Sequence, residues 1–306
     1  MTRWLRRLGA PFGERFLVLV ARLLGRVLTG LFAISLAFFA LQRIVPGNPA
    51  TALAGPGASA DAPLPAQYLG FLRHLAEADL GVSARTHQPV TGEMIAALPA
   101  TLELLVAASL GGLLIGIAAA LIGRAGGAAR VPRAALALAG ALPVYALAML
   151  LLLTWYFLRH LPGGASVEIG ARLAVPAAAL GLPVAFVVAN AMSFELEAAA
   201  RQTYFRAARA AGSTALHAAR QHGLRNALRL PLASFGVQFG VLLASLPVVE
   251  RLFDRAGLGA YLAQALAAHD LPASLGVTMA FATAYLVVDV AMAVLRAIVD
   301  PRLRLE

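Results

Sequence analysis

The sequence predicts an all-α membrane protein with six transmembrane helices, and three observations support this fold class. Hydrophobic residues make up 60% of the 306 residues, and the mean hydropathy of +0.78 lies above the usual range of soluble domains. Charged residues amount to only 13% of the chain and gather in short segments. The apolar runs between these segments approach the roughly 20 residues that a helix needs to cross a bilayer.

Six such runs are the candidate spans. They cover residues 27–41, 104–122, 134–158, 173–194, 232–249 and 275–295. The first run is short unless it extends back over residues 17–24, with Arg22 and Arg26 at the membrane interface and their stems along the helix. No small-residue cleavage site follows the basic N-terminal stretch, so we expect the first helix to be retained.

The arginines orient the predicted bundle. All 25 basic residues are arginine, and if the N-terminus is cytoplasmic, 18 of them lie on the inner side and seven on the outer side. This bias predicts that both termini are cytoplasmic, with an N-terminal arm over 1–23 and a transmembrane domain over 24–306. The high pI then reflects topology, so nucleic acid is not an expected partner. The absence of cysteine excludes disulfides and thiolate metal sites.

Two acidic residues, Glu103 and Asp289, lie within or at the edge of predicted spans. An ionisable side chain at membrane depth is a candidate functional group. For Glu103, one helical turn after Pro99, the alternative is a place at the outer interface near a helix start, where the helix dipole favours a carboxylate. For Asp289, the alternative is a structural hydrogen bond between helices.

Two segments outside the spans are long enough to carry a function. The external one covers about 45–98 and combines a turn-rich stretch with a short predicted helix near 67–78. The cytoplasmic one covers about 195–230, and its stretch from Arg201 to Arg229 contains six arginines but no acid. Good helix formers predict a helix that ends at Gly212, and the hydroxyl of Ser213 or Thr214 can cap a second helix that runs toward Pro231.

The two predicted helices of the cytoplasmic loop carry basic faces. Arg206 and Arg209 are three residues apart and therefore share one face of the first helix. A basic helical pair suits an acidic groove on another protein or anionic lipid headgroups. The alternative is that the positive charge serves only to hold the loop in the cytoplasm.

This loop also carries a family resemblance. The stretch YFRAARAAG at 204–212, followed by RNAL at 225–228 and Pro231, resembles the EAA motif of permease subunits of bacterial ABC importers, specifically the B-type permease of dipeptide and oligopeptide systems. Further matches occur in order along the chain: RIVPGNPA at 43–50, DLGVS at 79–83, LPATLEL at 98–104, VVERLFDRAGLG at 248–259 and DPRLR at 300–304. The departures are Ala256 in place of proline, Asn48 in place of aspartate, Ala211 in place of lysine, and a shortened external loop.

The resemblance implies a type I ABC importer permease fold with a cytoplasmic coupling-helix loop. It implies that the chain lies in the bacterial inner membrane and forms the translocation pathway with a second, C-type permease. Two ATPase subunits would bind ATP and Mg, and an extracytoplasmic substrate-binding protein would deliver a dipeptide or oligopeptide. The chain lacks a G-x-x-x-x-G-K-[ST] loop, so we expect a transport subunit that is not an enzyme and binds no cofactor.

Two sets of site residues follow from the matched motifs. The residues expected to contact the ATPase are Arg206, Arg209, Gly212, Ser213 and Thr214. A second hypothesis gives Glu250, Phe253, Gly257, Leu258 and Gly259 to an external gate or to the dock of the binding protein, and its alternative is a structural turn between spans.

The sequence leaves other functions open beside the importer. A related importer of nickel chelates or glutathione-like peptides is the nearest alternative. A proton-coupled secondary transporter would use Glu103 and Asp289 as relay groups. A membrane hydrolase is disfavoured because the sequence has neither H-E-x-x-H nor G-x-S-x-G, and no metal site is expected from its six histidines, all of which lie in predicted loops.

Overall fold

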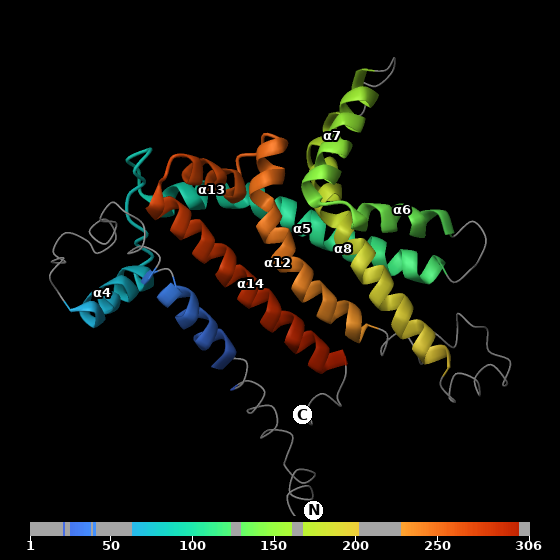
Figure 1. The fold of residues 1–306 in the computed structure, drawn as a ribbon, viewed down its shortest axis with the longest axis horizontal. Coiled ribbons are helices and arrows are strands. Elements are labelled where there is room, and N and C mark those ends of the chain that lie inside the picture. The colour runs from blue at the N-terminus through green and yellow to red at the C-terminus, as the bar shows by residue number, and fades with distance from the viewer. Residues whose placement is uncertain are drawn as a thin grey trace, which may run out of the picture. The chain divides into compact units, whose positions relative to one another are not determined.

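The computed structural model describes residues 21, 25–37, 39–40, 63–123, 130–160, 168–201 and 228–299. Every element labelled in Figure 1 is a helix. Within the described ranges the only strand-like pairing is an isolated bridge between Val82 and Pro89. The N-terminal helix Gly25–Ala37 precedes the labelled helices. These are α4 (Leu64–Ala76), α5 (Val90–Ile122), α6 (Arg130–Ala141), α7 (Val144–His160), α8 (Glu168–Ala200), α12 (Arg229–Leu252), α13 (Leu258–Ala267) and α14 (Leu271–Val299).

Four of these helices are long and apolar enough to cross a membrane: α5, α8, α12 and α14. They coincide with four of the six predicted runs. With 33 residues, α5 is about 50 Å long at 1.5 Å per residue, so it continues beyond a hydrocarbon core of about 30 Å. The N-terminal helix has only 13 residues within the described part of the chain, so the six-span count stays a prediction.

The run at 134–158 is not one continuous helix, which corrects the sequence prediction. α6 ends at Ala141, α7 begins at Val144, and the two helices meet at 119°. Pro143 explains the break, because it has no N–H to continue α6 and disfavours helical geometry at Leu142. Its carbonyl instead accepts the N–H groups of Ala146 and Leu147, each at 3.0 Å, and so begins α7. The pair counts as a fifth span only if the bend lies within one crossing.

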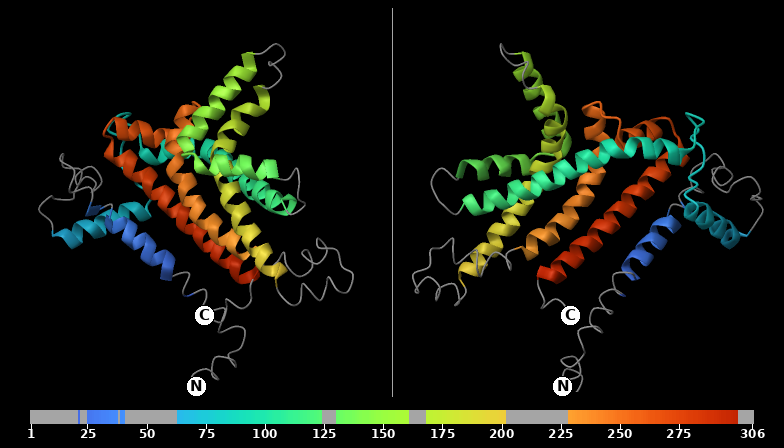
Figure 2. Two further views of the ribbon diagram at one scale, coloured as in Figure 1. Left: turned by 45° about the vertical axis from the view of Figure 1, so that its right-hand side comes forward. Right: turned by 180° about the vertical axis from the view of Figure 1, so that it is seen from behind.

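The chain divides into two compact units. The first contains residues 107–241 and 287–306 with the N-terminal segment, and the second contains residues 28–106 and 242–286. In the first unit α6 and α7 both pack against α8, as the views of Figure 2 show. A cluster of small and branched side chains fills the space between α5, α6 and α8: Ala119, Leu136, Ala185 and Ala189.

Small residues let α5 and α8 approach closely in the first unit. A Cβ added to Gly112 would lie 2.7 Å from the carbonyl oxygen of Gly181, and one added to Gly116 would lie 2.7 Å from that of Ala185. Gly112 and Gly116 are four residues apart, the spacing with which membrane helices bring their backbones together.

The second unit has its own core, built by α5, α13 and α14, and α13 lies beside the first turns of α5 (Figure 1). Its buried members are Val90, Leu258, Tyr261, Leu262, Ala265, Ala273 and Val277. In the same unit α4 packs on the N-terminal helix through an aromatic cluster, in which Tyr68 lies 5.2 Å from Phe39 and 6.2 Å from Phe32 between ring centroids. The Tyr68 hydroxyl shares a hydrogen bond of 2.8 Å with Ser35.

Candidate functional site

Glu250 lies at the centre of a buried hydrogen-bond network in the second unit. Its side chain, near the end of α12, is fully buried. Oε1 accepts a hydrogen bond of 2.7 Å from the Thr101 hydroxyl of α5, and Oε2 accepts one of 3.0 Å from the backbone N–H of Ala260 in α13. The backbone N–H of Leu258 donates to the same Thr101 oxygen at 2.7 Å. One carboxylate therefore connects three helices.

The start of α13 explains why a carboxylate is placed there. The first N–H groups of a helix have no partner within the helix, and the N-cap residue Gly257 has no side chain to offer one. Glu250 and Thr101 supply the missing acceptors from two other helices. The positive end of the helix dipole favours a negative charge at this point.

Gly257 and Gly259 are required by the same packing. A Cβ on Gly257 would collide with the Glu250 carboxylate, and a Cβ on Gly259 would lie 2.7 Å from the backbone nitrogen of Pro247. The structure thus brings together Glu250, Gly257, Leu258 and Gly259 from the predicted external set. Phe253 lies in the turn after α12, partly exposed, and takes no part in this hydrogen-bond network.

Glu103 is not near a helix start, which corrects the alternative considered from the sequence. α5 begins at Val90, so Glu103 lies more than three turns into the helix and Pro99 is inside it. Its carboxylate pairs with the Arg255 guanidinium, with Oε2 2.7 Å from Nη2. The same Nη2 donates to the carbonyl of Ala100 at 3.2 Å. Arg255 therefore fixes the turn between α12 and α13 to α5.

Asp289 of α14 pairs with Arg26 of the N-terminal helix, with 3.1 Å between Oδ2 and Nη1. The Asp289 side chain is 18% exposed and that of Arg26 is 60% exposed. Gly236 of α12 leaves room beside this carboxylate, since a Cβ there would come to 4.0 Å from Oδ1. The sequence predicts Arg26 at the membrane interface but predicts no partner for it, because residues 26 and 289 share no local pattern.

We expect Asp289→Asn and Arg26→Gln each to destabilise the protein, and the double variant to lose little more than either single one. A pair of this kind contributes about 1 kcal/mol of coupling energy. The measurement is the thermal midpoint of the four proteins in one detergent. The exposed pair Arg73 and Glu77 within α4, 3.0 Å apart, is the matched control and should show a smaller coupling. Fully additive effects at 26 and 289 would contradict the pairing.

The DLGVS segment is held by Asp270, the residue that precedes α14. The buried Asp270 carboxylate accepts hydrogen bonds from the Ser83 hydroxyl and from the backbone N–H groups of Arg85 and Ala273, at 3.3 and 3.2 Å for the latter two. Burial opposes the charge on this carboxylate, but the hydrogen bond from Ser83 and those from the backbone outweigh it and hold the pKa of Asp270 below its ordinary value. The carboxylate fastens the DLGVS segment onto the α13–α14 junction.

Glu93 and Tyr261 form a second polar contact between α5 and α13. The Tyr261 hydroxyl donates to Glu93 Oε2 at 2.7 Å, and the Thr86 hydroxyl donates to the same oxygen at 3.0 Å. Burial, followed by the hydrogen bond to Glu93, raises the pKa of the Tyr261 phenol far above its ordinary value. The phenol therefore stays protonated and holds the carboxylate in place. Neither residue belongs to one of the matched motifs, so no sequence pattern predicts this contact.

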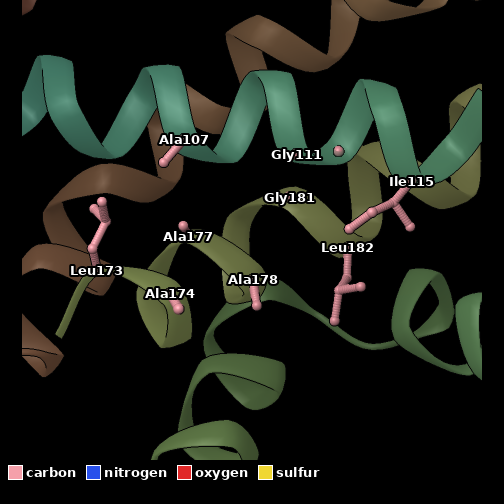
Figure 3. Close-up of a pocket in the computed structure, with 10 residues that line it drawn as sticks. Ala107, Gly111, Ile115, Leu173, Ala174, Ala177, Ala178, Gly181 and Leu182 are labelled. Atoms are coloured by element: carbon pink, nitrogen blue, oxygen red, sulfur yellow. The ribbon is translucent and has the colours of Figure 1, made fainter. Parts of the chain in front are cut away.

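An apolar pocket of about 330 Å³ lies between α5 and α8 in the first unit (Figure 3). Gly111 and Ile115 line it from α5, and Leu173, Ala177 and Leu182 line it from α8. All its lining side chains are aliphatic or absent, so it offers a peptide no polar side chain for a hydrogen bond.

The expected ATPase-contact residues Arg206, Arg209, Gly212, Ser213 and Thr214 lie outside the described residues, as do the N-terminal arm over 1–20 and most of the loop 195–230. Within the described part of the chain, no group of three or more histidines and acids is arranged to hold a metal ion.

Comparison with known proteins gives consistent similarities. A family model described as "Binding-protein-dependent transport system inner membrane component" matches residues 112–305. A di/tripeptide transport system permease protein of Pseudomonas aeruginosa (strain UCBPP-PA14) is 31% identical over 332 residues, covering 93% of this chain and 98% of the relative. A glutathione transport system permease protein of Escherichia coli (strain K12) is 29% identical over 310 residues, with the same two coverages. One from Salmonella choleraesuis (strain SC-B67) is 31% identical over 300 residues, covering 92% and 97%.

Proposed function

Because this chain belongs to the family of inner membrane components of binding-protein-dependent transport systems, we propose that it forms half of a translocation pathway for small peptides. It is a multi-pass permease subunit of an ABC importer in the bacterial inner membrane. The observation that carries the choice of cargo is the similarity, along nearly the whole chain, to permeases named for di/tripeptides and for glutathione, which is itself a tripeptide. Dipeptides and oligopeptides are the primary cargo of this proposal, and glutathione-like peptides or nickel chelates are its alternatives.

The proposed assembly contains one C-type permease, two ATPase subunits and an extracytoplasmic binding protein. ATP and Mg bind to the ATPase subunits, and this chain binds no cofactor of its own. Both termini lie in the cytoplasm, which puts the loop 195–230 within reach of the ATPases. Because the chain has no native cysteine, single-cysteine labelling tests this orientation. An impermeant maleimide should label Ala96→Cys in intact cells, and Gln221→Cys only after permeabilisation; the reverse pattern would reject the orientation.

Reconstitution tests the proposed function. The chain should copurify with the four partner proteins when all are expressed from neighbouring genes, and proteoliposomes should take up a labelled dipeptide only with ATP and the binding protein. Uptake by the chain alone, driven by a proton gradient, would instead support the secondary transporter. The arrangement of Glu103 and Asp289 does not favour that rival, because each carboxylate is paired with an arginine rather than placed with another relay group.

We expect Arg206→Glu and Gly212→Val to uncouple the importer. Closure of the ATPases would move a rigid cytoplasmic hairpin seated in their surface, and the hairpin would pass that displacement to the fourth and fifth predicted spans. Reversing the charge of Arg206 should remove its contact with the ATPase surface. A branched side chain at position 212 disfavours the backbone conformations that Gly212 is expected to adopt. Both variants should insert normally and show ATP hydrolysis, while peptide uptake falls at least about tenfold.

Arg201→Glu is the matched control for charge at the same loop, since Arg201 is exposed and precedes the motif. Its uptake should stay near that of the wild type. Unchanged uptake in both Arg206→Glu and Gly212→Val would reject the assigned role of the loop.

A further inference from the structure

A pocket of about 310 Å³ lies within the second unit, between the first turns of α5 and helix α13. Gly257, Ala260 and Tyr261 form its buried floor, and the exposed residues Ala96 and Ala256 form its rim. Glu250 does not line it, although the two are neighbours: a Cβ on Gly257 would meet the Glu250 carboxylate, and the Ala260 N–H donates to Glu250 Oε2. Four alanines and Gly257 leave this space open between the larger side chains of Glu93, Tyr261 and Gln264.

The polar side chains of this pocket are few, and only Glu93 among them is charged. Glu93 and Gln264 line it from α5 and α13. The two hydrogen bonds to Glu93, from Thr86 and Tyr261, both end on Oε2 and fix the direction of the carboxylate. Among the residues that the structure describes, no cation pairs with Glu93. The pocket thus presents an oriented carboxylate beside apolar walls, without a paired cation, although the positive charge of Arg85 acts on the neighbouring Tyr261 phenol.

This combination matches one kind of occupant. Lysine and arginine side chains lay an aliphatic stem along apolar surface and keep the charged head at a polar partner. The alanine walls suit the stem, and Glu93 with the Gln264 amide suits the head. A peptide lying across the pocket would also need partners for its backbone groups, which the alanine walls do not provide.

We infer that this pocket receives a lysine or arginine side chain of the extracytoplasmic binding protein when that protein docks. The inference rests on the proposed function, because it needs a binding protein and an external position for the first turns of α5. It adds to that function a docking residue, Glu93, and the charge of the group that the partner must present.

The test measures the affinity of the purified binding protein for the assembled importer in nanodiscs. Glu93→Gln keeps acceptors for Thr86 and Tyr261 but removes the charge, so it should weaken binding about fivefold to tenfold and reduce its dependence on salt. Ala96→Leu fills the rim without changing charge, so it should weaken binding while keeping the salt dependence. Glu77→Gln removes an exposed acid outside the pocket and should leave the affinity unchanged.

The outcomes separate the inference from the proposed function. If the wild type binds the binding protein and both pocket variants bind it equally well, the pocket is not the dock and the importer assignment stands. If Glu93→Gln leaves this affinity unchanged but raises the KM for dialanine and not for N-acetyl-dialanine, the occupant is the substrate ammonium and the inference is wrong. If the wild type binds no binding protein at all, both proposals fail.

Discussion

A Glu250→Ala variant is expected to be the most destabilised single substitution among the described polar residues. Truncation removes the acceptor for the Ala260 N–H and for the Thr101 hydroxyl, both at buried positions, and leaves a cavity beneath Gly257. A buried donor left without a partner costs about 1–3 kcal/mol, so the loss should reach about 3 kcal/mol. We expect a thermal midpoint lower by roughly 5–10 °C and a reduced yield of folded protein. Thermal unfolding in one detergent at one heating rate is the measurement.

Two further variants show whether the carboxylate itself is responsible. Glu250→Gln keeps one carbonyl oxygen as an acceptor and should fall between the wild type and the alanine variant. Glu77→Ala removes an exposed acid at the end of α4 and should melt with the wild type. If Glu250→Ala melts as Glu77→Ala does, the buried network does not hold α13 in place.

The Glu250 network also shows why the motifs can be recognised in the sequence, whereas their arrangement in space cannot be predicted from it. Thr101 belongs to LPATLEL and Glu250 to VVERLFDRAGLG, and the two residues are 149 positions apart. Each motif was matched separately, and nothing in local spacing indicates that a hydroxyl in one reaches a carboxylate in the other. A charged residue at the end of a span is ordinarily expected to face water. Only the fold shows that Glu250 is instead fully buried.

Hydropathy likewise predicts some features of the helices and misses others. The apolar runs located α5, α8, α12 and α14, because membrane-buried helices must be continuously apolar. The first turns of α5 include Thr91, Gly92 and Glu93, which a hydropathy scan discards, although the Pro89 carbonyl accepts the helix-starting hydrogen bonds of Gly92 and Glu93. Pro143 lies inside a predicted run. Because α8 and α12 contain proline and still continue as helices, a proline alone does not predict a break.

Closer to the membrane interior, Gly116→Ala is expected to destabilise the α5–α8 contact even though alanine is the better helix former. The new Cβ would lie 2.7 Å from the carbonyl oxygen of Ala185 and 2.8 Å from the Val188 Cβ. Backbone cannot move aside as a flexible side chain can, so overpacking should cost about 1–3 kcal/mol and outweigh a propensity gain of about 1 kcal/mol. Gly116→Val adds a branched side chain and should prevent accumulation of folded protein.

Gly111 supplies the matched control, because it lies on the same helix and a Cβ there meets no atom within 4 Å. Gly111→Ala gains helix propensity without a collision, so it should unfold at the same temperature as the wild type or slightly higher. Two identical substitutions, five residues apart, should therefore change the thermal midpoint in opposite directions. This result would show that close packing, and not helix propensity, is the reason for glycine at position 116. Equal thermal midpoints for the two alanine variants would show that α8 can move away from α5 without loss, and the close approach would then not stabilise the protein.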